Sequence, residues 1–237
     1  MNPDKIHTLQ QMGLGPVWQR RHMPAAGPGA STAELPAHEP AVAGDIAALD
    51  WDALEATIRD CTRCGLCQGR HHAVPGTGDR SARWLFVGEG PGRNEDLQGE
   101  PFVGPAGKLL DNMLRALDLA RGQNTYIANI VKCRPVGADG RDRPPTPEEV
   151  SACLPYLQRQ IALIRPDVIV ALGKTAAVSL LGLPVDTSLG SLRGTAREYA
   201  GVPLVITYHP AYLLRQPADK AKTWRDLCAA RDIIDGR

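Results

Sequence analysis

Short apolar runs alternate with longer amphipathic segments along most of this chain. The runs are rich in β-branched and aliphatic side chains, and glycine or polar residues stop them. They cover residues 83–88, 125–131, 167–172 and 203–208. Because each run is apolar throughout instead of alternating with polar residues, the pattern predicts strands that are buried on both faces.

The segments between these runs have apolar residues at helical spacing. They cover residues 45–60, 105–120, 146–164, 174–182 and 220–234. Strands that alternate with helices predict an α/β fold, here a three-layer α/β/α sandwich with a central four-stranded parallel sheet. In such sheets ligands bind at the carboxyl ends of the strands. The loops after residues 87, 129, 172 and 208 are therefore the places to look for chemistry.

The N-terminal part of the chain differs in composition from the rest. Residues 24–44 are dominated by Ala, Pro and Gly, which predicts a flexible extension over 1–44 and a folded domain over 45–237. Residues 1–60 hold four Lys/Arg and eight Asp/Glu, a net charge of −4, whereas the remainder has a net charge of +5. A weakly basic domain permits an anionic partner without requiring one.

Three cysteines lie within the stretch CTRCGLC, at Cys61, Cys64 and Cys67. The chain shows neither a signal peptide nor an apolar run of membrane-spanning length, so we expect a cytoplasmic protein with reduced thiols and no membrane partner. Clustered cysteines in that setting more often bind metal or do redox chemistry than form disulfides. The spacing alone suits zinc, a redox pair or an iron–sulfur cluster.

Two stretches imitate phosphate-binding loops. GEGPG at 88–92 follows a strand, but Arg93 and Glu95 stand where a dinucleotide-binding loop needs its third glycine. LGKTAA at 172–177 contains Gly-Lys-Thr, but Val168 stands where a P-loop needs its first glycine. Neither stretch therefore predicts a nucleotide site.

The remaining strand-end loops carry a set of side chains suited to a planar ligand. Phe102 lies in a Gly/Pro-rich loop where its ring could stack on a flat group. Asn129 ends a predicted strand, and its amide offers a donor and an acceptor for a base edge. His209 ends another strand, where it could donate to an oxygen that gains charge. Glu89 and Glu95 could place water or exclude bulky groups.

The stretch LLR at 213–215 places two apolar side chains beside a cation, which suits entry into a DNA groove. Taken singly, each of these residues is also compatible with an ordinary loop or core position. Only their joint placement at strand ends predicts a binding pocket.

The segments GEGPGRNED, GEPFVG, ANIVKCRP and YHPAYLLR, in this order behind CTRC, resemble the family-four uracil-DNA glycosylases. These are the iron–sulfur members of the uracil-DNA glycosylase superfamily. The resemblance covers about residues 58–235 and leaves 1–57 outside it. It implies an α/β/α fold and an enzyme that flips uracil out of DNA and hydrolyses its glycosidic bond.

The resemblance also implies a [4Fe–4S] cluster held by Cys61, Cys64, Cys133 and Cys153, with Cys67 as a spare. Zinc remains the alternative, because four thiolates also suit that metal.

The resemblance assigns roles to the pocket residues as well. Phe102 is expected to stack on uracil, Asn129 to read its edge and His209 to bond its O2. Glu95 is expected to disfavour the methyl group of thymine. Gly90 stands where better-known members of the superfamily carry a water-orienting aspartate, so water must be held in another way, with Glu89 as the candidate.

Leu213, Leu214 and Arg215 are expected to fill the gap that the flipped nucleotide leaves in the duplex. The stretch after Cys133 lacks the histidine with which one related branch traps DNA covalently, so we expect turnover. No lysine lies in the predicted pocket motifs, so we expect no lyase activity.

Two other functions compete with glycosylase activity. A binding module could recognise damaged or single-stranded DNA without cleavage, but the presence of both Asn129 and His209 favours the enzyme. An electron carrier would need an exposed cluster, which a large α/β domain does not favour. We expect single- or double-stranded uracil-containing DNA as the partner, a monomeric protein, and the N-terminal extension as a contact for replication or repair proteins.

Overall fold

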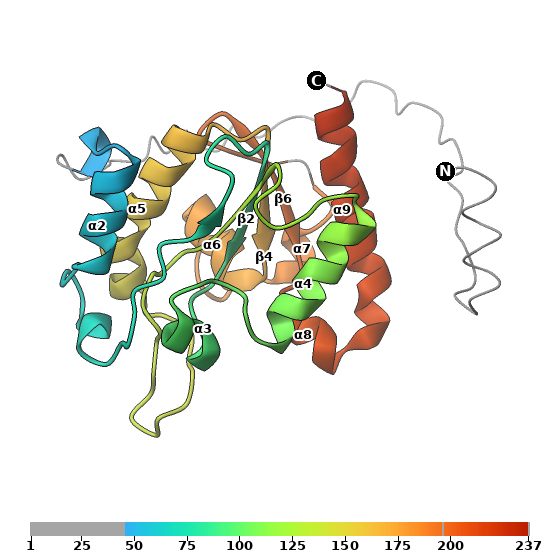
Figure 1. Ribbon diagram of the computed structural model, residues 1–237. Helices are drawn as coiled ribbons and strands as arrows, with labels where there is room; N and C mark the ends of the chain where they lie inside the picture. The colour runs from blue at the N-terminus through green and yellow to red at the C-terminus, as the bar shows by residue number, and fades with distance from the viewer. Residues whose placement is uncertain (1–45, 196, 237) are drawn as a thin grey trace. The chain divides into compact units, whose positions relative to one another are not determined.

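The computed structural model describes residues 46–195 and 197–236 (Figure 1). The predicted extension over 1–44 lies outside these residues. At the centre is a mixed six-stranded sheet with the order β1-β3-β2-β4-β6-β5. Its strands are β1 (Thr77–Gly78), β2 (Trp84–Gly88), β3 (Thr125–Asn129), β4 (Val168–Leu172), β5 (Arg197–Tyr199) and β6 (Val202–Thr207).

The four predicted strands are confirmed as β2, β3, β4 and β6, and they pair in parallel. Sequence patterning missed the two edge strands, β1 and β5, which pair antiparallel with β3 and β6. They are two and three residues long, too short for a hydrophobic period to register. The sheet is therefore six-stranded and mixed around the expected parallel core.

All five predicted helices are present. The α-helices are α2 (Trp51–Arg59), α3 (Arg93–Gln98), α4 (Pro105–Ala116), α5 (Pro147–Ile164), α6 (Lys174–Leu181), α7 (Leu189–Leu192), α8 (Pro210–Arg215) and α9 (Lys220–Asp235). The described ranges also contain three short 3-10 helices, η1 (Ile46–Ala48), η2 (Gly65–Gln68) and η3 (Pro217–Asp219). The segment predicted as one helix over 45–60 is divided, because the Asp50 side chain accepts the backbone N–H of Ala53 and begins α2 there.

Helices cover both faces of the sheet, so the three-layer arrangement is confirmed (Figure 1). Alternate residues of each strand enter different cores: Leu85 and Val87 join the core beneath α2, α5 and α6, whereas Trp84 and Phe86 join the core beneath α4 and α9. Burial on both faces is the reason why the strands are apolar throughout.

The order of the parallel strands creates a topological switch point. The chain passes from β2 to β3 on one side and then crosses to β4 on the other side of β2. Loops leaving the carboxyl ends of these strands diverge there and leave a crevice. Within the described part of the chain, no helix is long and apolar enough to cross a membrane.

Candidate active site

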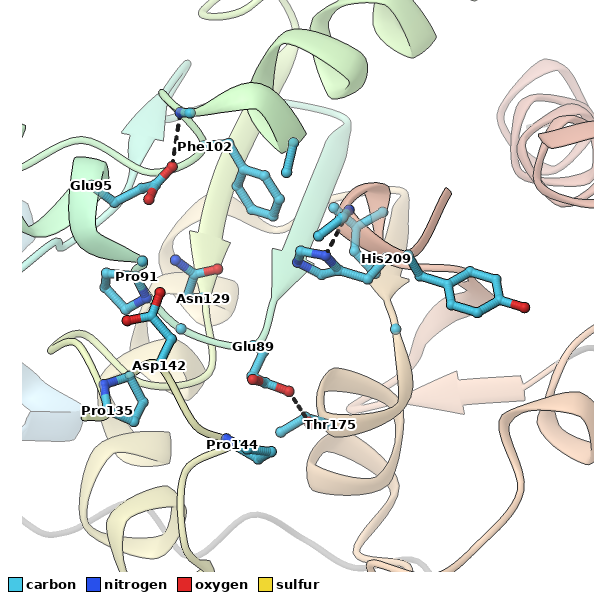
Figure 2. A pocket seen from close by; sticks show the side chains of 18 of the residues that line it. Glu89, Pro91, Glu95, Phe102, Asn129, Pro135, Asp142, Pro144, Thr175 and His209 are labelled. Atoms are coloured by element: carbon cyan, nitrogen blue, oxygen red, sulfur yellow. Dashed lines mark hydrogen bonds between the residues drawn. The ribbon is translucent and has the colours of Figure 1, made fainter. Parts of the chain in front are cut away.

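A cavity of about 660 Å³ opens at the carboxyl ends of the four parallel strands. Every one of these strands contributes lining residues at or just beyond its end, among them Glu89 after β2, Asn129 at the end of β3, Thr175 after β4 and His209 after β6 (Figure 2). Phe102, from the loop before α4, also lines it. The structure thus brings together predicted residues that lie up to 120 positions apart in the sequence.

The Phe102 ring forms one wall of the cavity. Its backbone has a φ of +57°, and its ring lies against the His209 ring with centroids 5.6 Å apart and planes inclined by 29°. Arg121 donates to the Phe102 carbonyl across 2.6 Å. Gly107 lies directly beneath that carbonyl, where an added Cβ would collide with the Phe102 backbone. This left-handed turn is therefore fixed by its surroundings.

Glu95 supports the same loop from the other side. Its Oε1 accepts the backbone N–H groups of Val103 and Gly104, each across 3.0 Å. The carboxylate lines the cavity, as expected, but these bonds also hold the two residues that directly follow Phe102. In this structure Glu95 is thus a support of the loop as well as a surface that faces the ligand.

The Asn129 side chain is buried, with 2% of its surface exposed. Among the described residues, its Oδ1 has no hydrogen-bond partner. Its backbone carbonyl accepts a hydrogen bond from the buried Lys132 ammonium across 2.9 Å. A Cβ at Gly88 would collide with Asn129 Oδ1 and lie 2.6 Å from the Phe102 ring. A buried acceptor without a partner is costly, so the site is prepared for a ligand that donates to it.

His209 is the N-cap of α8, and its Nδ1 accepts the backbone N–H of Ala211 across 3.1 Å. Burial, and to a smaller extent the nearby Arg215 cation, lower the pKa of His209 to about 4, and Glu95 opposes the shift. The imidazole is therefore neutral near pH 7. Because Nδ1 is an acceptor, the proton lies on Nε2. His209 thus has one N–H available as a donor.

Glu89 accepts a hydrogen bond from the Thr175 hydroxyl (Figure 2). Burial raises the pKa of the Glu89 carboxyl, and this hydrogen bond opposes the rise. Gly90 follows it, and a Cβ there would lie 2.8 Å from Val131 Cγ2. The backbone at Gly90 consequently has little room for a carboxylate side chain, which leaves Glu89 as the acidic residue at the end of β2.

The stretch predicted to enter DNA is a short helix, α8, and it has two unlike faces. Leu213 is 1% exposed, so the expectation that its side chain projects outward was wrong. It belongs to the buried face because α8 packs on α4. Leu214 is 46% exposed, and Arg215 is exposed and lines the cavity. Only these two can reach outward.

The structure also adds cavity residues that sequence reasoning missed. They include Asp142, Arg143, Lys174 and Thr175. Lys174 lies outside the predicted pocket motifs, whereas Lys132 lies inside one of them, ANIVKCRP, so the expectation that these motifs hold no lysine was wrong. The sequence signal for Lys174 and Thr175 is their position just after the end of a parallel strand, β4.

A second, small cavity is lined by five cysteines, Cys61, Cys64, Cys67, Cys133 and Cys153. They come from three separate segments of the chain. The four residues predicted as ligands are thus brought together, and Cys67, predicted to be a spare, lies there too. Within the described ranges, no three metal-binding side chains converge closely enough to hold a single ion.

Several donors point at these sulfur atoms. Arg70 donates to Cys133 Sγ and the Lys132 backbone N–H donates to Cys153 Sγ, each across 3.2 Å. Burial raises the pKa of the Cys153 thiol to about 12. A buried thiolate at that position therefore requires a compensating positive charge such as a metal centre. The donor set fits a thiolate-bound group.

The sequence of this chain is similar to those of known proteins. Residues 75–228 match the family model described as the Uracil DNA glycosylase superfamily. The chain is 43% identical over 185 residues to the type-4 uracil-DNA glycosylase of Pyrobaculum aerophilum, covering 76% of this chain and 92% of that protein. It is 45% identical over 169 residues to the type-4 enzyme of Thermotoga maritima, covering 70% and 83%.

The chain belongs to the type-4 uracil-DNA glycosylases. A type-5 uracil-DNA glycosylase of P. aerophilum is also similar, at 31% identity over 59% of this chain and 66% of that protein. The matched family region begins after the first three cysteines, so it contains the strand-end cavity but only part of the cysteine cavity. The type-4 relatives therefore extend the likeness beyond the region common to the superfamily.

Proposed function

We propose that this protein excises uracil from DNA by hydrolysing the N-glycosidic bond, leaving an abasic site for base excision repair. The observation that carries the proposal is the convergence of Phe102, Asn129 and His209 on one cavity at the strand ends. The cavity holds a flat aromatic wall, an amide oxygen without a partner among the described residues, and a neutral imidazole donor. These are complementary to one flipped pyrimidine.

Base recognition rests on Asn129. Its Oδ1 accepts the uracil N3–H, and its amide nitrogen donates to O4. Cytosine carries an acceptor at N3 and an amino donor at position 4, so it would leave both amide atoms mismatched. Oδ1 has no hydrogen-bond partner within residues 46–195 and 197–236, which supports this role. Phe102 stacks on the ring, held by the loop that Glu95 supports.

Bond cleavage depends on stabilising uracil as it leaves. As the bond between C1′ and N1 breaks, the electron pair stays on the base and its O2 gains negative charge. His209 Nε2–H donates to that oxygen, whereas Nδ1 is fixed by Ala211. Donors placed in advance at developing charge are often the largest catalytic contribution.

Water completes the reaction at C1′. Glu89 lines the cavity and orients the attacking water. The water oxygen bonds to C1′, and one water proton moves to the Glu89 carboxylate. Leu214 occupies the space that the flipped nucleotide vacates, and Arg215 lies beside it for a phosphate. Leu213 has no part in this contact because it is buried.

We also propose a [4Fe–4S] cluster on Cys61, Cys64, Cys133 and Cys153. Four thiolates from three segments that line one cavity are the usual ligand complement of such a cluster. When bound, the cluster would join the segment before β1 to the β3–α5 connection, and it would supply no redox step. Lys132 lies next to this site and bonds to the Asn129 carbonyl. The cysteine segment thereby supports the base-reading residue.

The reaction stops at the abasic site. A lyase needs an amine nucleophile that a dry pocket activates. Lys174 lines the cavity but is exposed to solvent, and Lys132 is buried in the neighbouring network with its ammonium bonded to Asn129 and Gln160. Neither arrangement suits attack on the sugar.

The test uses a uracil-containing oligonucleotide, single-stranded or paired with guanine, incubated with purified protein. Alkali then cleaves any abasic site. Cleavage at uracil that is greatly reduced in His209→Ala supports the proposal, and a thymine-containing oligonucleotide serves as the substrate control. An intact strand bound by folded protein would instead indicate a DNA-binding module.

A further inference from the structure

The Gly-Lys-Thr stretch at 173–175 begins α6, where β4 ends. It is not a P-loop, because the position where a P-loop needs its first glycine is Val168, which lies inside β4. Yet all three residues line the same cavity as Glu89 and His209. The reaction proposed above gives this stretch no role.

Gly173 lets this turn approach His209. Its φ is +96°, and an added Cβ would lie 2.9 Å from the His209 Cβ. Its backbone N–H donates to the Thr207 carbonyl across 2.8 Å, which fixes the turn to the end of β6. The turn therefore keeps a constant position relative to both strand ends.

Thr175, in the same turn, contacts the end of β2, which neighbours β4 on the side away from β6. Its hydroxyl donates to Oε2 of Glu89, the residue that follows β2. Among the residues that the structure describes, no other side chain is hydrogen-bonded to the Glu89 carboxylate. No lysine or arginine in the described ranges forms an ion pair with it. The Thr175 hydroxyl is thus the side-chain contact that holds this carboxylate in place, and Oε1 is left to accept from water.

We propose that Thr175 is a positioning residue of uracil excision, whose hydroxyl orients the Glu89 carboxylate so that Oε1 faces the attacking water. This inference rests on the proposed function. Near-attack placement of a reactant contributes strongly to catalysis, so a freely rotating Glu89 would be much less effective. The water proton moves to Oε1, and Thr175 keeps its own proton throughout.

The charged groups around the cavity determine how the pKa of Glu89 should respond when the Thr175 hydroxyl is removed. The other charged or titratable groups around the cavity are Arg93 and Glu95 on α3, Asp142 and Arg143 before α5, Lys174 on α6, and His209, Tyr212 and Arg215 at α8. None of them opposes the effect of burial on the pKa of Glu89, whereas the Thr175 hydrogen bond does. Removal of that hydroxyl therefore raises the pKa of Glu89 further. Glu89 then ionises only at higher pH.

The experiment measures single-turnover rates of uracil release against pH for the full chain. Thr175→Val keeps the shape of the side chain and removes the hydroxyl, whereas Thr175→Ser restores it. We expect Thr175→Val to lower the rate by roughly tenfold to a hundredfold and to move the acid limb to higher pH. Thr175→Ser should recover most of the rate and the original limb.

The matched control is Thr223→Val, on α9. The Thr223 hydroxyl is buried and has no hydrogen-bond partner among the described residues, so its loss should leave both rate and pH profile unchanged. The double variant Glu89→Gln/Thr175→Val should be no slower than Glu89→Gln alone, because Thr175 acts through Glu89.

Two results overturn the inference alone: an unmoved acid limb in Thr175→Val, or additive losses in the double variant, with the wild-type protein active. Wild-type protein that releases no uracil overturns the proposed function and this inference together. If Glu89→Gln releases uracil at the wild-type rate, the proposed role of the carboxylate is overturned, and with it the role of Thr175.

Discussion

The Ala211 backbone N–H donates to Nδ1 of His209 across 3.1 Å, which makes one side chain both the cap of a helix and a member of the cavity. The cap leaves the imidazole proton on Nε2 and fixes the direction of that N–H bond. Protonation of the ring would break the cap, because Nδ1 could no longer accept. The backbone geometry thus favours the neutral donor.

The titration of His209 tests this arrangement. Burial holds its pKa at about 4, below the usual 6.5. The NMR signal of its ring should therefore titrate near pH 4, and the rate of uracil release should show no inflection near pH 6.5. Because Arg215 also lowers the pKa of His209, Arg215→Ala should raise it and Arg215→Lys should not. An imidazole that titrates near 6.5 in the wild-type protein would contradict the assignment.

Base specificity should depend on the Asn129 amide. Asn129→Asp replaces the amide nitrogen with a second oxygen, so the donor to uracil O4 is lost and a carboxylate enters a buried site. We expect the rate on uracil to fall by about a hundredfold or more, and the ratio of cytosine to uracil release to rise. Single-turnover assays on matched uracil and cytosine oligonucleotides measure both. An unchanged ratio would show that Asn129 does not read this edge.

Leu213 and Leu214 form a matched pair of substitutions. Leu213→Ala creates a cavity in the core and should lower the free energy of unfolding by about 2–5 kcal/mol. Leu214→Ala should leave stability nearly unchanged, because that side chain is 46% exposed. It should slow uracil release from duplex DNA more than from single strands. Equal effects on both substrates would remove Leu214 from the role of wedge.

Glu95 can be tested through the loop that it supports. Glu95→Gln keeps an oxygen that accepts from Val103 and Gly104, so activity should fall only a few-fold. Glu95→Ala removes that support and should weaken substrate binding by about tenfold, as the Phe102 wall loosens. Titration of a uracil-containing oligonucleotide with each variant measures this. If Glu95→Gln is as damaging as Glu95→Ala, the charge matters more than the support.

We expect the cysteines that line the small cavity to differ in their contribution to iron binding. Cys133→Ser should reduce bound iron, visible absorption and thermal stability together, because a structural metal stabilises the fold that binds it. Cys67→Ser should retain the iron, although its side chain lines the same cavity. Purified variants are compared by iron content and melting temperature. Iron lost from Cys67→Ser, or zinc found in the wild-type protein, would revise the ligand set or the metal.

Much of this architecture could be predicted because burial leaves a mark on the sequence. The four central strands are apolar on both faces, and the Thr146 capping box gives α5 a clear start. Helix α8 has six residues, too few to show a helical period, so the sequence does not predict the burial of Leu213. The bond between Thr175 and Glu89 joins residues 86 positions apart, and only the strand order brings them together.

A substitution at Gly107 would affect the active site although this residue lies outside the cavity. It has no polar side chain and does not line the cavity, yet any Cβ there would strike the backbone that presents the Phe102 ring. In a mutant screen, a substitution at this helical position would have the phenotype of a lost active-site residue. An inherited change at Gly107 would thus raise the frequency of C-to-T mutations while every residue that touches DNA stayed intact.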